Sequence, residues 1–383
     1  MNKMKLFYAS LLLLGLSIPS CKSSQSEPAG PPQEFTAVAD DGNVADPQEV
    51  AQMDSLLQAW VNEEKLNCVT AFVAKGGEVL YHKAFGFRDT AQQVPAQPDD
   101  YYVLFSQTKA VTTVAFMTLV EKGLVAVDDP VVDYFPEISD QVVTKVNEDG
   151  TYETRPVASP MTFAHLMSHS SGLGAGLVRE IRQRERQQQA EGSGESAAGG
   201  QRSFGGDGKA RYLEDEMKKL ASYPLGFDPG SEWNYHVSTN MLAYMIEVIS
   251  GQSLQEYVKE TVLDPLGMDE TDWYYEPEAL DRFVVPHTLV DGKLMPGSTN
   301  FSEGAVSEER TYAEGAIGLN GPIEDYAKFC QMLLNEGEFN GNRILQPETI
   351  ATMTDENQLP DENAGGKGFA FGLGFELQNE RKK

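Results

Sequence analysis

Residues 104–137 read LFSQTKAVTTVAFMTLVEKGLVAVDDPVVDYFPE, so Ser106 and Lys109 stand three positions apart at the head of a largely apolar segment. The apolar spacing predicts a helix over 107–122, which Gly123 ends. Side chains three positions apart on a helix share one face. We therefore expect the Ser106 hydroxyl and the Lys109 amine to lie together at the start of this helix.

A serine in that position can act as a nucleophile. Its oxygen lies at the positive end of the helix dipole, and its backbone N–H, which the helix does not use, can donate to a developing oxyanion. Lys109 can take the serine proton only as a neutral amine, and burial lowers the pKa of an amine. Because about one S-x-x-K tetrad is expected by chance in a chain of this length, a capping serine beside a solvated lysine is the competing interpretation.

The residues before this segment predict a helix packed on an antiparallel sheet. Asp46 and Pro47 begin a predicted helix, with Asp46 as its cap. Two β-prone runs, 68–75 and 78–87, flank Gly76-Gly77 and predict a hairpin. An amphipathic helix followed by antiparallel strands indicates an α+β fold.

The remainder of the chain is predicted to be mostly helical. Further helices are expected at 162–168, 238–250, 254–263 and 322–334. Because one hairpin is not a stable sheet, the remaining strands are expected from the C-terminal end. We therefore predict one domain over 46–383, in which helices flank an antiparallel sheet that carries an inserted, mostly helical region.

Residues 179–208 differ in character from the segments around them. Four arginines are followed by three glutamines and a stretch rich in Gly, Ser and Ala, which predicts a flexible insertion with one basic helical turn. Two interpretations stay open: a lid that borders the site and attracts an acidic substrate, or a disordered surface loop.

The N-terminus has the pattern of a secretory signal. Lys3 and Lys5 precede an apolar run that is too short to span a bilayer comfortably. The sequence IPSC, which ends at Cys21, resembles the bacterial lipobox. This resemblance implies removal of residues 1–20 and acylation of Cys21, which would anchor the chain in a membrane. An ordinary secretory signal that ends near a cysteine is the alternative.

The residues after the signal predict a flexible acidic tether over 21–45, because they are rich in Ser, Pro, Gly and acidic residues. Lys22 directly follows the cysteine, and it is not an acidic residue of the kind that retains a lipoprotein in the inner membrane. We therefore expect a lipid-anchored protein of the bacterial cell envelope, held in the outer membrane on its periplasmic face or at the cell surface.

Composition excludes several partners and folds. The 58 acidic and 30 basic residues give a formal charge of -28, which repels a nucleic-acid backbone. Three cysteines cannot form a disulfide framework, and Cys68 and Cys330 are left either to pair or to stay as buried thiols. No cluster of His, Cys or carboxylates has metal-ligand spacing, so we expect no metal and no cofactor. The sequence indicates no oligomeric state.

Residues 104–137 resemble the beta-lactamase-related serine hydrolases, which include class C beta-lactamases, D-alanyl-D-alanine carboxypeptidases and family VIII carboxylesterases. The resemblance continues in order through MTFAHLMSHSSGL (161–173), PGSEWNYHVSTNMLAYMIEVISG (229–251), SLQEYVKETVLDPLGMDETD (253–272) and residues 316–334. Five blocks in this order are far more specific than one motif. The resemblance implies the fold of serine beta-lactamases and penicillin-binding proteins, with Ser106 as the acylated nucleophile and Lys109 as its activating partner.

The second motif of the family is a tyrosine followed two positions later by asparagine, and the sequence YHV at 235–237 keeps only the tyrosine. The resemblance implies that the Tyr235 phenol relays a proton between Ser106 and the leaving group. A core tyrosine with a satisfied hydroxyl is the alternative. Val237 stands where the asparagine amide would contact a substrate amide, and this departure favours an esterase.

The third motif of the family, on a late strand, is Lys-Thr-Gly, His-Thr-Gly or Trp-Gly-Gly, and none of these follows Tyr235. Residues 369–377 (FAFGLGFEL) resemble the strand before that motif, and the sequence stops at Lys383. We expect a truncated sequence that lacks its C-terminal strands, because a sheet with an open edge is hard to keep soluble. His165 and His169 correspond to a stretch that is structural in the family.

These features predict a lipid-anchored serine hydrolase that forms an acyl-enzyme on Ser106, with Lys109 and Tyr235 moving protons. The first expectation is a carboxylesterase that acts on a small-molecule ester. The second is a D,D-peptidase or beta-lactamase that acts on peptide-like, peptidoglycan-type amides. The third is a non-catalytic envelope protein that uses the same fold only for binding.

Overall fold

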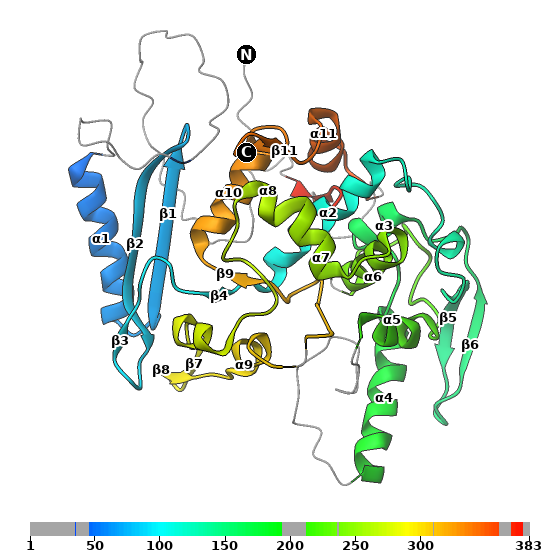
Figure 1. Cartoon of the computed structure of the whole chain (residues 1–383). Helices are drawn as coiled ribbons and strands as arrows, with labels where there is room; N and C mark the ends of the chain where they lie inside the picture. The colour runs from blue at the N-terminus through cyan, green and yellow to red at the C-terminus, as the bar shows by residue number, and fades with distance from the viewer. Residues whose placement is uncertain are drawn as a thin grey trace.

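The computed structural model describes Phe35 and residues 46–193, 212–235, 237–308, 310–359 and 369–377 (Figure 1). The predicted signal and, apart from Phe35, the predicted tether lie outside this part of the chain. The Phe35 ring packs 5.2 Å from that of Phe72 and 5.3 Å from that of Phe339. Among the described residues, no helix combines the length and the apolar character that crossing a membrane requires.

The N-terminal helix and hairpin form as predicted. α1 (Pro47–Asn62) is capped by Asp46, whose carboxylate accepts a hydrogen bond of 2.8 Å from Gln48 N. β1 (Cys68–Lys75) pairs antiparallel with β2 (Glu78–Asp89), and β3 (Val94–Pro95) extends the sheet in the order β1-β2-β3. Figure 1 shows this sheet between α1 on one side and α10 (Ile323–Leu334) on the other.

The central helix of the molecule is α2 (Thr108–Glu121). It is apolar on nearly all of its faces, and it is therefore buried all round. The side chains that are 0% exposed include Val111, Val114, Ala115, Phe116 and Leu119. α6 (Ser238–Ser250) packs against α2, and α3 (Phe163–Met167) places the ring of Phe163 4.9 Å from that of Phe116.

The other elements surround this pair of helices. The helices are α5 (Leu213–Ala221), α7 (Leu254–Val258), α8 (Asp264–Leu266), α9 (Asn300–Ala305) and α11 (Pro347–Asp355). The strands form separate antiparallel pairs: β5 (Gln141–Val146) with β6 (Tyr152–Pro156), β7 (His287–Val290) with β8 (Lys293–Pro296), and β10 (Glu338–Phe339) with β11 (Asn342–Arg343). The predicted α+β class is confirmed.

The helix predicted over 254–263 does not end before Pro265. A π-helical turn, Lys259–Leu263, joins α7 to α8, and Pro265 lies in the first turn of α8. A proline is tolerated there because the first N–H groups of a helix have no partner within it.

Half of the predicted flexible insertion, residues 179–208, is a regular helix. α4 spans Gly176–Ser193, so the prediction of a flexible segment with one basic helical turn is wrong for this half. Val178 and Ile181, which are 0% and 4% exposed, form a small cluster with residues of β5. Two apolar residues three positions apart give α4 a face to bury, and such packing stabilises helices more than propensity does. Residues 194–208 lie outside the described part of the chain.

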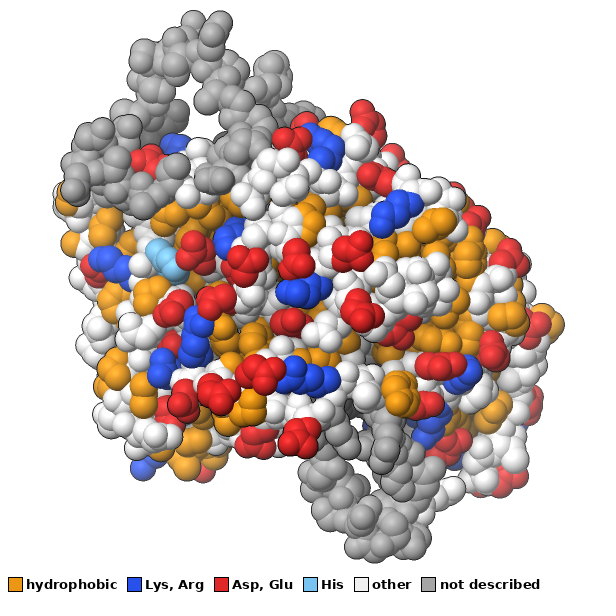
Figure 2. All heavy atoms as spheres, in the orientation of Figure 1, with side chains coloured by type: hydrophobic (Ala, Val, Ile, Leu, Met, Phe, Trp, Pro, Cys, Tyr) orange, Lys and Arg blue, Asp and Glu red, His pale blue; other side chains and the backbone are white. Residues whose placement is uncertain are grey.

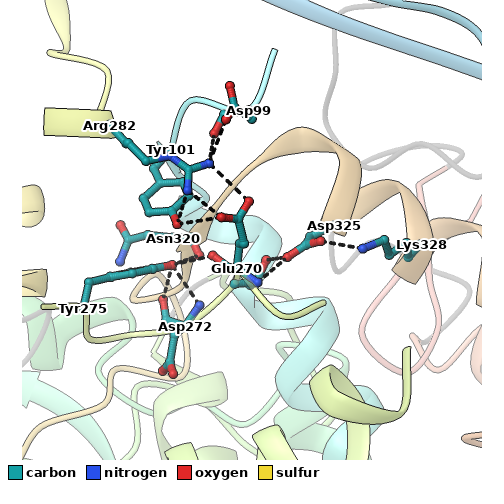
Figure 3. A network of polar contacts seen from close by, with 10 residues as sticks. Asp99, Tyr101, Glu270, Asp272, Tyr275, Arg282, Asn320, Asp325 and Lys328 are labelled. Carbon is teal, nitrogen blue, oxygen red and sulfur yellow. Dashed lines mark hydrogen bonds and ion pairs between the residues drawn. The ribbon is translucent and has the colours of Figure 1, made fainter. Parts of the chain in front are cut away.

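β4 (Tyr102–Val103) lies in the chain between the β1-β2-β3 sheet and α2. It pairs antiparallel with β9 (Asn320–Gly321). Arg282 lies in the polar network beside this pair (Figure 3). Its guanidinium donates to Glu270 at 2.5 Å and lies 4.1 Å from the centre of the Tyr101 ring. These contacts brace Tyr101, the residue that leads into β4.

The same network continues on the far side of Glu270. The Glu270 backbone N donates to Asp325 at 3.0 Å, and Lys328 donates to the other oxygen of Asp325 at 2.8 Å (Figure 3). The Tyr275 hydroxyl donates to the backbone oxygen of Asn320 at 2.6 Å. Asn320 of β9 is therefore held by the loop 267–276, and Asp325 of α10 holds that loop in turn.

The excess of acidic residues is visible on the surface, and two of the three cysteines can be placed in the fold. Acidic side chains are spread over much of the described face in Figure 2, and basic side chains lie among them. Cys68 is buried and Cys330 half-buried, and both are free thiols in the structure. In the described part of the chain, no group of three or more His, Cys, Asp or Glu is arranged to hold a metal ion.

The network around Arg282 gives a stability prediction. We expect Arg282→Met to lower the free energy of unfolding by about 1–3 kcal/mol, because Glu270 loses a partly buried partner. Lys145→Met is the control, since its ion pair with Glu153 is exposed and should contribute less than about 1 kcal/mol. Equilibrium urea denaturation measures both, and equal losses in the two variants would contradict a bracing role for Arg282.

Candidate active site

Ser106 lies in a 3-10 turn, Phe105–Gln107, that leads directly into α2. A hydrogen bond of 3.1 Å from Leu319 N to Thr108 Oγ1 holds the end of this turn. Phe105 has a φ of 45°, a left-handed conformation that a bulky residue adopts only where its surroundings impose it. The turn leaves Ser106 exposed to solvent.

The Lys109 amine lies beside the Ser106 hydroxyl, as their spacing predicts. Its Nζ donates to Ser106 Oγ at 3.3 Å and to the backbone oxygen of Ala316 at 2.8 Å. The residue is only 4% exposed. This burial lowers the pKa of Lys109 to about 8, while the nearby Glu314 acts in the opposite direction. A fall of this size raises the neutral fraction of the amine at pH 7 by roughly two orders of magnitude.

Tyr235 completes the group from the loop before α6. Its hydroxyl is hydrogen-bonded to Ser106, and the Lys109 Nζ lies 4.8 Å from the centre of its ring. Burial raises the pKa of Tyr235 more strongly than the hydrogen bond to Ser106 lowers it. The structure therefore brings together all three residues that the sequence analysis singled out in the folded domain.

Burial moves the pKa values of Lys109 and Tyr235 in opposite directions, because it disfavours the charged form of each group. The amine becomes easier to deprotonate and the phenol harder. Near neutral pH, Lys109 is thus the group suited to accept a proton, and Tyr235 is the group suited to donate one.

Val237 lies buried at the start of α6, where it is 6% exposed and packs in the main core. It offers no polar atom in the position where the resembling family has its asparagine. The site therefore lacks an amide from this residue that could hold a substrate amide.

Two residues near Lys109 were missed by the sequence analysis. Asn240 of α6 donates from Nδ2 to Glu314 at 3.1 Å and accepts from Ala316 N at 2.9 Å. Burial raises the pKa of Glu314 to about 7. The available signal was Glu314 itself, a single carboxylate in the small and apolar sequence AEGAIGL (313–319).

The two histidines to which the resemblance gives a structural role lie in different surroundings. His165 Nδ1 interacts with the backbone N and the hydroxyl of Thr162 at the start of α3, and burial lowers its pKa. His169 is 3% exposed, and its ring lies 4.6 Å from that of Tyr235. The buried ring of His169 therefore packs against the ring of Tyr235.

The arginines of α4 reach different partners. Arg179 donates to Asn234 Oδ1 at 3.0 Å, next to Tyr235 in the chain. Arg184 donates to the backbone oxygen of Asn147 at 3.0 Å, away from that loop. The first turn of α4 therefore borders the site, and the suggestion that the insertion acts as a lid stays a prediction.

The stretch 369–377 is not one continuous strand. It forms two short strands, β12 (Ala370–Phe371) and β13 (Glu376–Leu377), around Gly374, whose φ is 87°. A Cβ at Gly374 would lie 2.8 Å from Thr113 of α2, so this turn approaches the central helix too closely for any other residue. Beside the site, the ring of Phe369 lies 4.7 Å from that of Trp233.

Comparison with known proteins places this geometry in a family. A family model described as Beta-lactamase matches residues 53–383. Esterase EstB of Burkholderia gladioli is 29% identical, over 84% of this chain and 78% of its own length. Lovastatin esterase of Penicillium rubens is 28% identical, over 82% of this chain and 74% of its own length.

Solved structures show the same fold. Simvastatin synthase (LovD) of Aspergillus terreus has a TM-score of 0.67 at 25% identity, over 86% of this chain and 82% of its own. EstCE1, described as a hydrolase with promiscuous acyltransferase activity, has a TM-score of 0.68 at 21% identity, over 88% of this chain and 84% of its own. Since the family model spans most of the sequence, the chain belongs to the beta-lactamase family, and it is a serine hydrolase.

Proposed function

We propose that this chain is a carboxylesterase that forms an acyl-enzyme on Ser106. The observation that supports this most strongly is the Lys109 amine, 3.3 Å from Ser106 Oγ and buried so that its pKa falls to about 8. A lysine with a pKa close to the working pH can act as a general base, which an exposed lysine cannot.

In the acylation step, neutral Lys109 takes the Ser106 proton as Oγ attacks the carbonyl carbon of the ester. The resulting tetrahedral intermediate collapses when the bond to the alkoxide breaks, and the Tyr235 phenol gives that alkoxide a proton. The Lys109 ammonium then returns a proton to the Tyr235 phenolate. The alcohol leaves, and the acyl group stays on Ser106 as an ester.

In the deacylation step, water attacks the acyl carbonyl and gives up a proton to neutral Lys109. The bond from Ser106 Oγ to the acyl carbon breaks, and the lysine proton passes to the serine oxygen. The sum is one ester and one water converted to one acid and one alcohol. Lys109, Tyr235 and Ser106 all return to their starting protonation states.

Two observations favour an ester over an amide as substrate. Val237 gives no amide that could hold a substrate amide, and an ester depends less on such a contact. Two of the similar proteins are named as esterases, EstB and lovastatin esterase. The D,D-peptidase or beta-lactamase alternative has the family description in its favour.

The location proposed for this enzyme is the bacterial cell envelope, with a lipid on Cys21 as its anchor. The support is the sequence alone: a basic start, a short apolar run and IPSC at the cysteine. Lys22 favours the outer membrane. Such an anchor would place Ser106 in contact with small-molecule esters that enter the envelope.

Substrate class can be tested by comparing p-nitrophenyl acetate with nitrocefin. We expect the ester to be hydrolysed with a kcat/KM at least about tenfold higher, because the site lacks the amide contact that a lactam uses. Ser106→Ala and Lys109→Met should each lower ester turnover by about a hundredfold or more. Turnover of nitrocefin without turnover of the ester would show that the inference from Val237 is wrong. Inactivity on both substrates in every preparation would favour a non-catalytic binding protein.

The anchor can be tested with Cys21→Ser in the bacterial host. We expect the variant to move from the membrane fraction to the soluble fraction, because removal of the acylated thiol removes the lipid chains. Cys68→Ser is a matched control and should stay with the membranes. Retention of Cys21→Ser in the membrane fraction would contradict the proposed lipid anchor.

A further inference from the structure

A buried carboxyl that the proposed reaction does not use acts electrostatically on Lys109. Glu314 is 5% exposed. It lies close in the chain to Ala316, whose carbonyl accepts the hydrogen bond from Lys109. An unpaired buried carboxylate is costly, and a group kept in such a place has a structural or electrostatic role to explain.

Asn240 connects Glu314 to Ala316, the residue whose carbonyl accepts from Lys109. This asparagine is 0% exposed, and its amide oxygen accepts from Ala316 N at 2.9 Å. Because a backbone N–H can only donate, this contact fixes the orientation of the amide and turns Nδ2 toward Glu314 Oε1 at 3.1 Å. The backbone oxygen of Ala316 in turn accepts from Lys109 Nζ at 2.8 Å.

The backbone of this segment is fixed as well as its side chains. Thr112 Oγ1 of α2 donates to Gly315 O at 2.8 Å, and Trp273 Nε1 donates to Glu314 O at 3.0 Å. A Cβ at Gly315 would lie 2.3 Å from Ala243 Cβ of α6, so the segment lies closely against that helix. Glu314 therefore cannot move away from Lys109 without breaking several buried contacts.

In the part of the chain that the structure describes, one charged group acts on the protonation of Lys109. Its Nζ contacts Ser106 Oγ, the Ala316 carbonyl and the face of the Tyr235 ring. The charged group that acts on its protonation is Glu314, which raises the pKa of Lys109 against the effect of burial. Lys109 reciprocally lowers the pKa of Glu314, and so does the hydrogen bond from Asn240.

We propose that Glu314, held in place by Asn240, is a positioning residue that orients Lys109 and limits how easily the amine loses its proton. This inference rests on the proposed function, in which Lys109 is the base. Glu314 keeps the buried amine from becoming so weakly basic that it no longer takes the Ser106 proton. Asn240 joins that carboxyl to the backbone N–H of Ala316, the residue whose carbonyl accepts from the amine.

The inference can be tested on the full chain by NMR of protein labelled with 13C at lysine Cε. The Lys109 signal is assigned by its loss in Lys109→Met, and its titration is followed in the wild type and in Glu314→Gln. We expect the titration midpoint of Lys109 to fall by about one pH unit in Glu314→Gln, because the amine loses an anionic neighbour. Glu247→Gln, which removes a carboxylate carried by α6 itself, should leave the midpoint unchanged.

Asn240→Ala is the second variant, and it keeps the proposal testable if Glu314→Gln does not fold. Loss of the Asn240 hydrogen bond makes Glu314 less acidic, so the Lys109 midpoint should shift in the same direction. An unchanged Lys109 midpoint in the folded variants would overturn the inference. The midpoint does not depend on turnover, so ester hydrolysis, measured separately, reports on the proposed function.

The pH dependence of kcat/KM should shift in the same direction as the titration midpoint of Lys109. The acidic limb of kcat/KM for p-nitrophenyl acetate should move to lower pH in Glu314→Gln, while the limb in Glu247→Gln stays in place. A shifted NMR midpoint with no ester hydrolysis in the wild type would mean that the carboxyl tunes the amine and that the esterase proposal fails. Hydrolysis by the wild type with unshifted limbs and midpoints would leave the esterase proposal intact and overturn the role of Glu314.

Discussion

The burial of one amine, that of Lys109, is the constraint on which the site depends. An ammonium ion is poorly accommodated in a protein interior, so burial shifts the balance toward the neutral amine that can accept a proton. The amine is not left without partners, because it donates to Ser106 Oγ and to the Ala316 carbonyl. Its position is thus set by hydrogen bonds that do not require a full charge, and its pKa falls to about 8.

Segments far apart in the sequence create this environment. The helix α2 carries Lys109 on a face that is buried, and it supplies Thr112 to hold the backbone at Gly315. The helix α6 supplies Asn240, and the loop before α6 supplies Tyr235. The pairing of β4 with β9 and the network around Arg282 keep the turn before α2 in register with the segment after Glu314 (Figure 3). A buried base therefore needs most of the fold to be in place before it can act.

The sequence was sufficient where the signal is local. The spacing of Ser106 and Lys109 on a helix, and the Gly-Gly turn between β1 and β2, follow from periodicity and backbone sterics. The sequence was insufficient where a role depends on contacts between distant residues. Asn240 and Glu314 come together near Lys109 only because α6 packs on α2. The helix α4 was missed because its arginines suggest a solvated segment, while two apolar residues find a partner in β5. The strand expected at 369–377 rests on resemblance to the late strand of the family, and the resemblance does not reveal that Gly374 turns the chain against Thr113.

The rate at which a fluorophosphonate modifies Ser106, measured between about pH 6 and pH 10 with the adduct located by mass spectrometry, tests the central claim most directly. If a buried Lys109 activates the serine, the rate rises with pH and is half-maximal near pH 8, because only the neutral amine accepts the proton. In Lys109→Met the adduct should form at least about a hundredfold more slowly and without this pH dependence. A rate that is flat over this range in the wild type, or an adduct on a residue other than Ser106, would contradict it.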